Sequence, residues 1–241
     1  MELREKVISA SRRTDLPGFY WRWFMNRLDA GFCDVASPFD AGRVRRVSLA
    51  PRDVAAFVFW TRCARPMLPS VDQLREAGFA FYVHYTITGY PRELEPGVPS
   101  REESVNGLLS LSEKVGPHRV IWRYDPIVLS TATPAAYHER EFASLARDLR
   151  GAVDVAYISF CDFYAKTRRA FARVAAETGW TFEAGTREEQ AALAGRLADL
   201  ARAEGMEVRA CAETGLDAAG VRPGSCVDPA LLARPRPDLD L

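Results

Sequence analysis

Several apolar segments of this 241-residue chain run directly into side chains of the kinds that bind ligands and move protons. VISA (7–10) is followed by SRRTD, and VIW (120–122) is followed by RYD. The candidate site residues found in this way are Ser11, Arg12, Arg13, Asp15, Trp60, Arg62, His84, Thr86, Arg123, Asp125, Ser159 and Glu213. The planar fork of arginine matches a carboxylate or a phosphate, whereas His84, Asp125 and Glu213 are candidate acids, bases or metal ligands. The set predicts a pocket for a small ligand with an anionic group.

Alternation along the apolar segments places these polar side chains on one face of a predicted sheet. Successive side chains of a strand point to opposite faces. In FAFYVHYTIT (79–88), the face opposite the apolar set carries Tyr82, His84, Thr86 and Thr88. In VIWRYDP (120–126), Arg123 and Asp125 share one face in the same way. We therefore expect the polar residues to line the inside of a barrel mouth. Arg123 with Asp125 or Glu213 could equally form a structural ion pair inside it.

The spacing of the apolar segments predicts an α/β fold with a parallel sheet. The predicted strands are 7–10, 56–61, 79–88, 119–123, 155–160 and 206–212, with a weaker one at 32–36. Strands separated by helices imply right-handed crossovers. A doubly wound sheet usually carries a Gly-rich phosphate loop, and neither GxGxxG nor GxxxxGK[ST] occurs in the chain. We therefore expect a complete or partial (β/α) TIM-like barrel over residues 1–232, followed by a tail at 233–241.

Helix starts and histidines add local predictions. The capping-box pattern, in which two side chains satisfy orphan backbone N–H groups, occurs at Ser70 with Gln73, Ser100 with Glu103, and Thr186 with Glu189. Thr133 followed by Pro134 predicts a fourth start. His118 and His138 are expected at the surface.

Composition limits the classes of partner. Lys+Arg 32 balance Asp+Glu 32, so net charge does not call for nucleic acid or an anionic membrane. No apolar stretch approaches the ~20 residues of a membrane-spanning helix, and MELREKVISA is unlike a signal peptide. We expect a cytoplasmic protein. The five cysteines form no CxxC pair and are expected to be reduced. Cys211 is a candidate metal ligand, and Cys226 a weaker one.

An ordered series of motifs resembles a known family over nearly the whole chain. The motifs are ISASRRTDLPGFYWRWFMNRL, VSLAPRDVAAFVFWTR, YTITGY, ELEPGVPS, RVIWRYDPIVLS and CAETGLDAAGVRPGSCVD. They resemble the bacterial family catalogued as domain of unknown function 1848. Many members of that family continue past the segment matching GSCVD into a tail with a pattern like TCxHGCxYCYA, which resembles an iron–sulfur site.

The resemblance implies a barrel related to radical S-adenosylmethionine enzymes and spore photoproduct lyase-like proteins. S-adenosylmethionine is then a candidate cofactor, with a cluster only in a longer natural form, because this chain has SRRTD where such enzymes place CxxxCxxC. In that interpretation Arg13, Arg62 and Arg123 hold carboxylate or phosphate groups. Glu213 and Asp125 accept hydroxyl or amino groups of the ligand.

Two other functions remain open at this stage. The first is a metal-assisted hydrolase or isomerase, in which His84, Asp125 and Glu213 hold a divalent ion. The second is a binding module for nucleic acid or a protein, which would use FYWRWF and the arginines of GRVRRV and KTRR. We consider the binding module the least favoured of the three functions, because the chain has no excess of positive charge.

Overall fold

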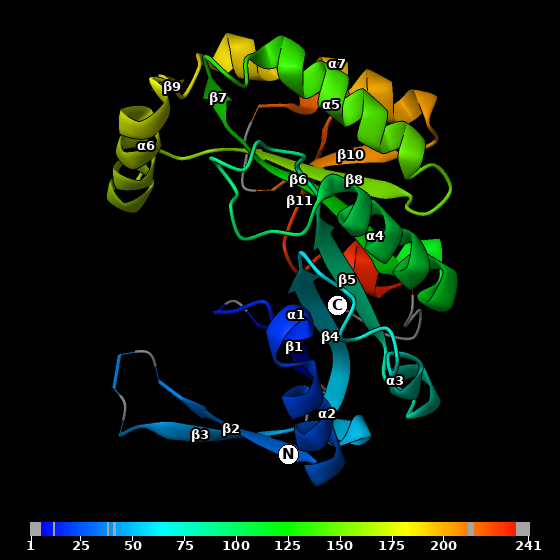
Figure 1. Cartoon of the computed structure of the whole chain (residues 1–241). Coiled ribbons are helices and arrows are strands. Elements are labelled where there is room, and N and C mark those ends of the chain that lie inside the picture. Colours follow the sequence, from blue (N-terminus) through cyan, green and yellow to red (C-terminus); the bar gives the residue numbers. More distant parts are fainter. Residues whose placement is uncertain (1–5, 12, 38, 41, 212–214, 235–241) are drawn as a thin grey trace.

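A curled, open sheet of parallel strands forms the centre of the molecule (Figure 1). The computed structural model describes residues 6–11, 13–37, 39–40, 42–211 and 215–234. The seven strands, in spatial order, are β1 (Lys6–Ala10), β4 (Val54–Thr61), β5 (Phe81–Thr86), β6 (Val120–Ile127), β8 (Val155–Phe160), β10 (Glu207–Cys211) and β11 (Arg222–Gly224). Within the described residues, the edge strands β1 and β11 do not pair with each other. The fold is therefore a half-barrel, the partial form of the predicted barrel.

Helices cover one face of this sheet and bury most of the apolar side chains. They are α1 (Leu16–Phe19), α2 (Trp21–Ala30), α3 (Asp72–Glu76), α4 (Arg101–Val115), α5 (Ala135–Asp148) and α7 (Arg187–Ala203). A further helix, α6 (Ala165–Thr178), lies to the side of this layer, where the Phe171 ring stacks on Phe182 (Figure 1). The main core joins Phe24 of α2, Leu108 of α4 and Leu197 of α7 to the outward side chains of the strands. No helix among the described residues is long and apolar enough to cross a membrane.

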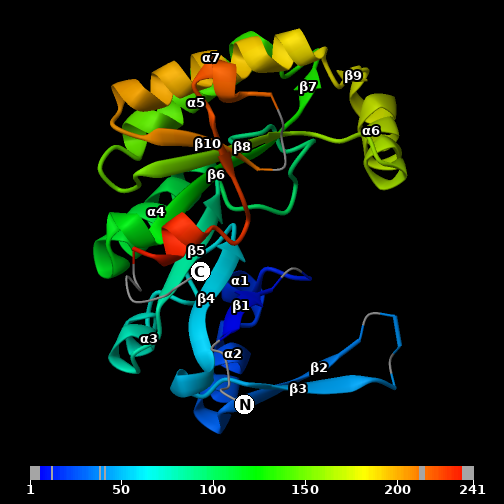
Figure 2. The ribbon, with the colours of Figure 1, turned by 180° about the vertical axis from the view of Figure 1, so that it is seen from behind.

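The opposite, inner face of the sheet is covered by the end of the chain. Figure 2 shows the segment after β11 crossing in front of the strands, on the side away from α4, and ending in α8 (Pro229–Leu232). Leu231 and Leu232 are fully buried against Ala56, Tyr82 and Ile121. Because β4 has a small residue at 56, α8 can lie close to the strands. This short helix therefore fills the inside of the half-barrel.

The remaining elements lie outside the main sheet. The weakly predicted strand at 32–36 is present as β2 (Phe32–Ala36), but it pairs antiparallel with β3 (Val44–Ser48) in a hairpin that projects from the body (Figure 1). A second short pair joins β7 (Leu129–Ser130) to β9 (Phe182–Glu183). The peptide bonds Ala10–Ser11 and Asp125–Pro126 are cis.

Two of the three predicted capping boxes are confirmed, at Ser100 with Glu103 and at Thr186 with Glu189. The box at Ser70 is wrong, because α3 begins later and the Ser70 hydroxyl instead accepts a hydrogen bond from the indole N–H of Trp21 at 2.8 Å. The helix predicted at Thr133 starts with Pro134 as its N-cap.

The surface position predicted for His138 is wrong. This ring is fully buried, with Nδ1 2.9 Å from the Tyr124 hydroxyl and Nε2 3.0 Å from the Val128 carbonyl. A helix pattern does not show that two ring nitrogens will find buried partners, and those partners are what make burial of a histidine tolerable.

Candidate functional site at the carboxyl edge of the sheet

The carboxyl ends of the central strands bring polar side chains into one row on the inner face. In the sheet register, Thr86 lies beside Arg123, Arg123 beside Tyr157, and Tyr157 beside Arg209. Neighbours in one register row point to the same face. The alternation read from the sequence therefore placed Thr86 and Arg123 on the correct face.

Arg123 and Asp125 form an ion pair within β6. The Asp125 carboxylate accepts hydrogen bonds from Nε of Arg123 at 2.9 Å and from Nη2. The Ser159 hydroxyl donates to the same carboxylate at 3.3 Å. Burial disfavours the charge on Arg123, but the pairing with Asp125 outweighs it and raises the pKa of the guanidinium. The fork of Arg123 is thus occupied by Asp125. Nη1, also buried, has no hydrogen-bond partner among the described residues.

Two thiols lie beside this guanidinium. The sulfur atoms of Cys211, at the end of β10, and Cys226 are 3.3 Å apart. A hydrogen bond from the Cys211 thiol, together with the positive charge of Arg123, lowers the pKa of Cys226 to about 6 although partial burial opposes this. The same contact, together with burial, raises the pKa of Cys211. Cys226 is therefore the more acidic thiol of the pair, and Cys211 the one that keeps its proton longer.

His84 is fully buried in β5, the strand that pairs with β6, and contacts the backbone at Cys226. Its Nε2 lies 3.0 Å from the Cys226 carbonyl, so Nε2 carries the hydrogen and donates it. Nδ1 has no partner among the described residues. Burial, reinforced by the charge of Arg123, lowers the pKa of His84 to about 3. This histidine is a neutral hydrogen-bond donor near pH 7, and its geometry favours a positioning role over proton exchange.

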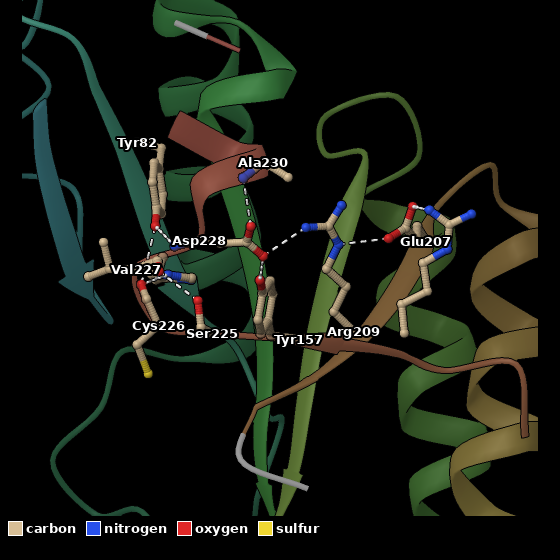
Figure 3. Close-up of polar contacts among 11 residues, drawn as sticks. Tyr82, Tyr157, Glu207, Arg209, Ser225, Cys226, Val227, Asp228 and Ala230 are labelled. Carbon is tan, nitrogen blue, oxygen red and sulfur yellow. Dashed lines mark hydrogen bonds and ion pairs between the residues drawn. The ribbon is translucent and has the colours of Figure 1, made fainter. Parts of the chain in front are cut away.

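A buried carboxylate fastens the C-terminal segment to the inner face (Figure 3). Asp228 is the N-cap of α8 and accepts a hydrogen bond from the backbone N–H of Ala230 at 2.9 Å. It also accepts from the Tyr157 hydroxyl at 2.6 Å and from Nη1 of Arg209 at 2.8 Å. The Asp228 N–H in turn donates to the Tyr82 hydroxyl at 3.0 Å. We call Tyr82, Tyr157, Arg209 and Asp228 the clasp.

The clasp determines where Cys226 lies. The Tyr82 hydroxyl donates to the Cys226 carbonyl at 3.2 Å, alongside the bond from His84. Glu207 extends the network by pairing with Arg209 at 2.7 Å and with Arg222 at 3.4 Å. Because these contacts fix the carbonyl of Cys226 and the residue two positions after it, the sulfur of Cys226 is held at the wall of a pocket.

That pocket has a volume of about 380 Å³ and opens beside the ends of β1, β4 and β5. Its walls are formed by Ser11, Thr14, Asp15, Trp60, Thr61, Arg62, Thr86 and Cys226. A smaller pocket of about 70 Å³ shares Arg62 and Thr86 with it. The Arg62 guanidinium donates to Glu95 at 2.7 Å, and Glu95 also accepts from Thr88 at 2.6 Å. Arg62 therefore stands at the junction of the two spaces.

The other predicted residues divide into four groups. Trp60 stacks on the His84 ring with centroids 5.3 Å apart, and both remain within the site. Asp15 lines the pocket, but its oxygens are occupied by the N–H groups of Gly18 and Arg62 and by the Thr61 hydroxyl. Arg13 does not join the group, because it is exposed and donates to the Ala36 carbonyl at 3.1 Å. Arg12 and Glu213 lie outside the described residues.

Sequence reasoning missed the clasp. Asp228 precedes Pro229, and an aspartate before proline is a typical start of a helix with proline in its first turn. Alternation along VRACAET (208–214) places Arg209 on the polar face of its strand, but its partner Asp228 is 19 positions away. No local pattern joins these residues to Tyr82 and Tyr157, so only the tertiary structure reveals the set.

Neither a metal nor an iron–sulfur cluster fits the donors that the structure describes. Within the described ranges, no three side chains of His, Cys, Asp or Glu gather in a way that could hold a metal ion. Clusters are usually held by three or four thiolates, and only Cys211 and Cys226 meet here. The positive guanidinium of Arg123 beside both sulfur atoms further disfavours a cation.

Comparison with known proteins agrees with the motif series. No curated protein matches the chain. The model of the family described as domain of unknown function (DUF1848) matches residues 7–237, which is nearly the whole chain. The half-barrel with its C-terminal clasp thus belongs to a member of the DUF1848 family.

Proposed function

We propose that this protein is an enzyme that binds a small anionic or nucleotide-like molecule in the pocket at the carboxyl edge of its half-barrel. The observation that carries the proposal is the 380 Å³ pocket with Arg62 in its wall. Small-molecule sites typically measure ~300–1,000 Å³, and barrel enzymes place them at the carboxyl ends of their strands. The position and size of this pocket both suit a metabolite.

Arg62 is the proposed anchor for the anionic group. Its guanidinium has five N–H donors, and the contact with Glu95 uses only part of them. Donors therefore remain for a carboxylate or a phosphate. With its side chain 32% exposed, Arg62 can meet a ligand from solvent without breaking a buried pair. Arg123, by contrast, uses two of its guanidinium nitrogens to bind Asp125. It does not line the pocket and would affect a ligand only through its positive charge.

The rest of the wall supports a nucleotide-like ligand. Trp60 offers an aromatic surface on which a base can pack. The hydroxyls of Ser11, Thr14 and Thr86 are suited to sugar or phosphate oxygens. Cys226, the more acidic thiol of the pair, contributes its sulfur to the same wall. A bound molecule would therefore meet both an anion-binding group and a nucleophile.

Titration calorimetry tests the proposal with three probes: inorganic phosphate, adenosine monophosphate and S-adenosylmethionine. We expect at least one to bind, and Arg62→Gln to weaken that binding tenfold or more, because a charge-assisted hydrogen bond is lost. Arg65→Gln is the matched control, since Arg65 lies on the surface with its side chain 73% exposed and pairs with Glu103. Equal affinity in both variants, or no heat with any probe, would contradict the proposal.

A metal-assisted hydrolase or isomerase is the alternative proposal. It would need His84, Asp125 and Glu213 to converge, but Nε2 of His84 is already turned to the Cys226 carbonyl. Elemental analysis of the purified protein separates the two functions. Stoichiometric zinc or manganese that is lost in Asp125→Asn would favour the metal-assisted hydrolase.

A further inference from the structure

The thiols of Cys211 and Cys226 meet on the inner face although they are 15 positions apart in the chain. Cys211 ends β10 and Cys226 follows β11, the parallel neighbour of β10 in the sheet. The sulfur atoms are 3.3 Å apart and a disulfide requires ~2.05 Å, so they must approach each other by about 1.2 Å to bond.

The two thiols differ in access. Cys226 lines the 380 Å³ pocket, whereas Cys211 is not among the residues of its wall. A molecule entering from solvent therefore reaches Cys226 first. Cys211 lies behind it, in contact with its sulfur, which is the position of a second thiol that completes an exchange.

The charge around the pair favours redox chemistry over metal binding. Arg123 is 7% exposed and stabilises the negative charge of a thiolate on either sulfur. Its Nη1 has no other hydrogen-bond partner in the described part of the chain. The same positive charge opposes a metal cation between the sulfur atoms. The Asp125 carboxylate also acts on Cys226, but it is paired with Arg123.

We propose that Cys211 and Cys226 form a redox-active dithiol that exchanges with the disulfides of small thiols. The Cys226 thiolate attacks one sulfur of RS–SR, forming a Cys226–S–S–R bond and releasing RS⁻. The Cys211 thiol then loses its proton and attacks the Cys226 sulfur, which forms the Cys211–Cys226 disulfide and releases the second RS⁻. The protein is oxidised by two electrons and RS–SR is reduced to two thiols.

Oxidation of the two thiols would change the wall of the 380 Å³ pocket. A disulfide removes the thiolate from the pocket wall and ties residue 226 covalently to β10. This activity does not require the anionic ligand of the proposed function. Loss of ligand binding in Arg62→Gln therefore leaves the exchange reaction intact, and the two proposals can fail separately.

Oxidised glutathione is the probe that tests the dithiol. We expect free thiols in the purified protein to fall from five to three. Trypsin leaves both cysteines in one peptide because proline follows Arg222, but cleavage after Glu213 by a glutamate-specific protease separates them. The two fragments should then remain joined until a reductant is added.

Single substitutions assign the roles. Cys211→Ser should stop the reaction at a glutathione adduct on Cys226, and Cys226→Ser should leave Cys211 unmodified. Cys63→Ser and Cys161→Ser are matched controls and should still form the Cys211–Cys226 link. Retention of all five thiols would overturn the proposal, as would a link that uses another cysteine. Stoichiometric zinc or copper that is lost in Cys211→Ser would also overturn it, because the pair would then be a metal site.

Discussion

The Tyr157 hydroxyl donates a hydrogen bond to the Asp228 carboxylate at 2.6 Å, although 71 positions separate the two residues in the chain. Tyr157 lies in β8, next to the central strand β6, and Asp228 is the N-cap of α8. The bond therefore joins the centre of the half-barrel to the segment that carries Cys226. Stability of the fold and the position of the thiolate depend on the same contact.

Asp228→Ala should destabilise the protein strongly. The change leaves Arg209 with one buried partner fewer and removes the cap of α8, and breaking a buried pair costs about 3–5 kcal/mol. The free energy of unfolding in urea measures the effect. Asp199→Ala is the control, because its ion pair with Arg202 is exposed and should be worth less than about 1 kcal/mol. Equal losses in the two variants would show that the clasp does not hold the segment.

Gly224→Ala should disturb the clasp without touching any charge. A Cβ at this position would lie 2.6 Å from Cε1 and 2.8 Å from the hydroxyl of Tyr157, which is fully buried and cannot move freely. We expect a loss of about 1–3 kcal/mol, as for other overpacked sites, measured by urea unfolding. Gly97→Ala provides the comparison, since a Cβ there meets nothing within 4 Å. If Gly224→Ala is as stable as Gly97→Ala, the ring of Tyr157 is not confined.

The buried histidines predict that stability falls as the pH drops below about 6.5. Burial lowers the pKa of His84 to about 3 and that of His138 to about 4, from 6.5 in the unfolded chain. Between these values the unfolded state binds protons that the native state does not, so stability rises with pH. Each histidine contributes a slope of about 1.4 kcal/mol per pH unit.

His84→Gln isolates one of these two contributions. Glutamine retains a donor for the Cys226 carbonyl but does not titrate. Between pH 5 and 6, where most carboxylates are already ionised, the slope of unfolding free energy against pH should fall by about half. An unchanged slope would mean that His84 is protonated in the native state and does not donate through Nε2 as a neutral ring.

The sequence predicted the fold correctly where a strand was long enough for the alternation of apolar and polar residues to be recognised. The strand segments are apolar and alternate with period two, so the inward positions of His84, Thr86 and Arg123 followed from counting. The pairing of Arg123 with Asp125 was one of two alternatives left open, because alternation shows that two residues share a face but not which of them bond.

The rest of the site has no periodic signal. The C-terminal segment reaches the inner face through single contacts, such as Arg209 with Asp228, whose partners are set by the curl of the sheet. Arg13 was predicted to belong to the site because it comes soon after the end of β1. Its side chain instead donates a hydrogen bond to the Ala36 carbonyl in the hairpin. A residue that follows a strand in sequence therefore need not point its side chain into the site at the end of that strand.

The Cys226 thiolate predicts a distinct pH profile for alkylation. The hydrogen bond from Cys211 and the charge of Arg123 lower the pKa of Cys226 to about 6, whereas burial raises the pKa of Cys33 and of Cys161 above its ordinary value. Because only the thiolate reacts, the rate with iodoacetamide at Cys226 should reach half its maximum near pH 6, when followed peptide by peptide by mass spectrometry. Cys33 and Cys161 should remain slow at that pH.

Substitutions at Cys211 show whether Cys211 or Arg123 sets the pH midpoint for alkylation of Cys226. Cys211→Ser keeps a hydroxyl that can donate to the Cys226 sulfur, so the midpoint should stay low, whereas Cys211→Ala removes the donor and should move it upward. Arg123 remains in both variants, and its charge alone should hold the Cys226 midpoint below that of Cys161. A midpoint near 9 in the unsubstituted protein would show that neither neighbour acts on Cys226, and the thiol would then be an ordinary half-buried cysteine.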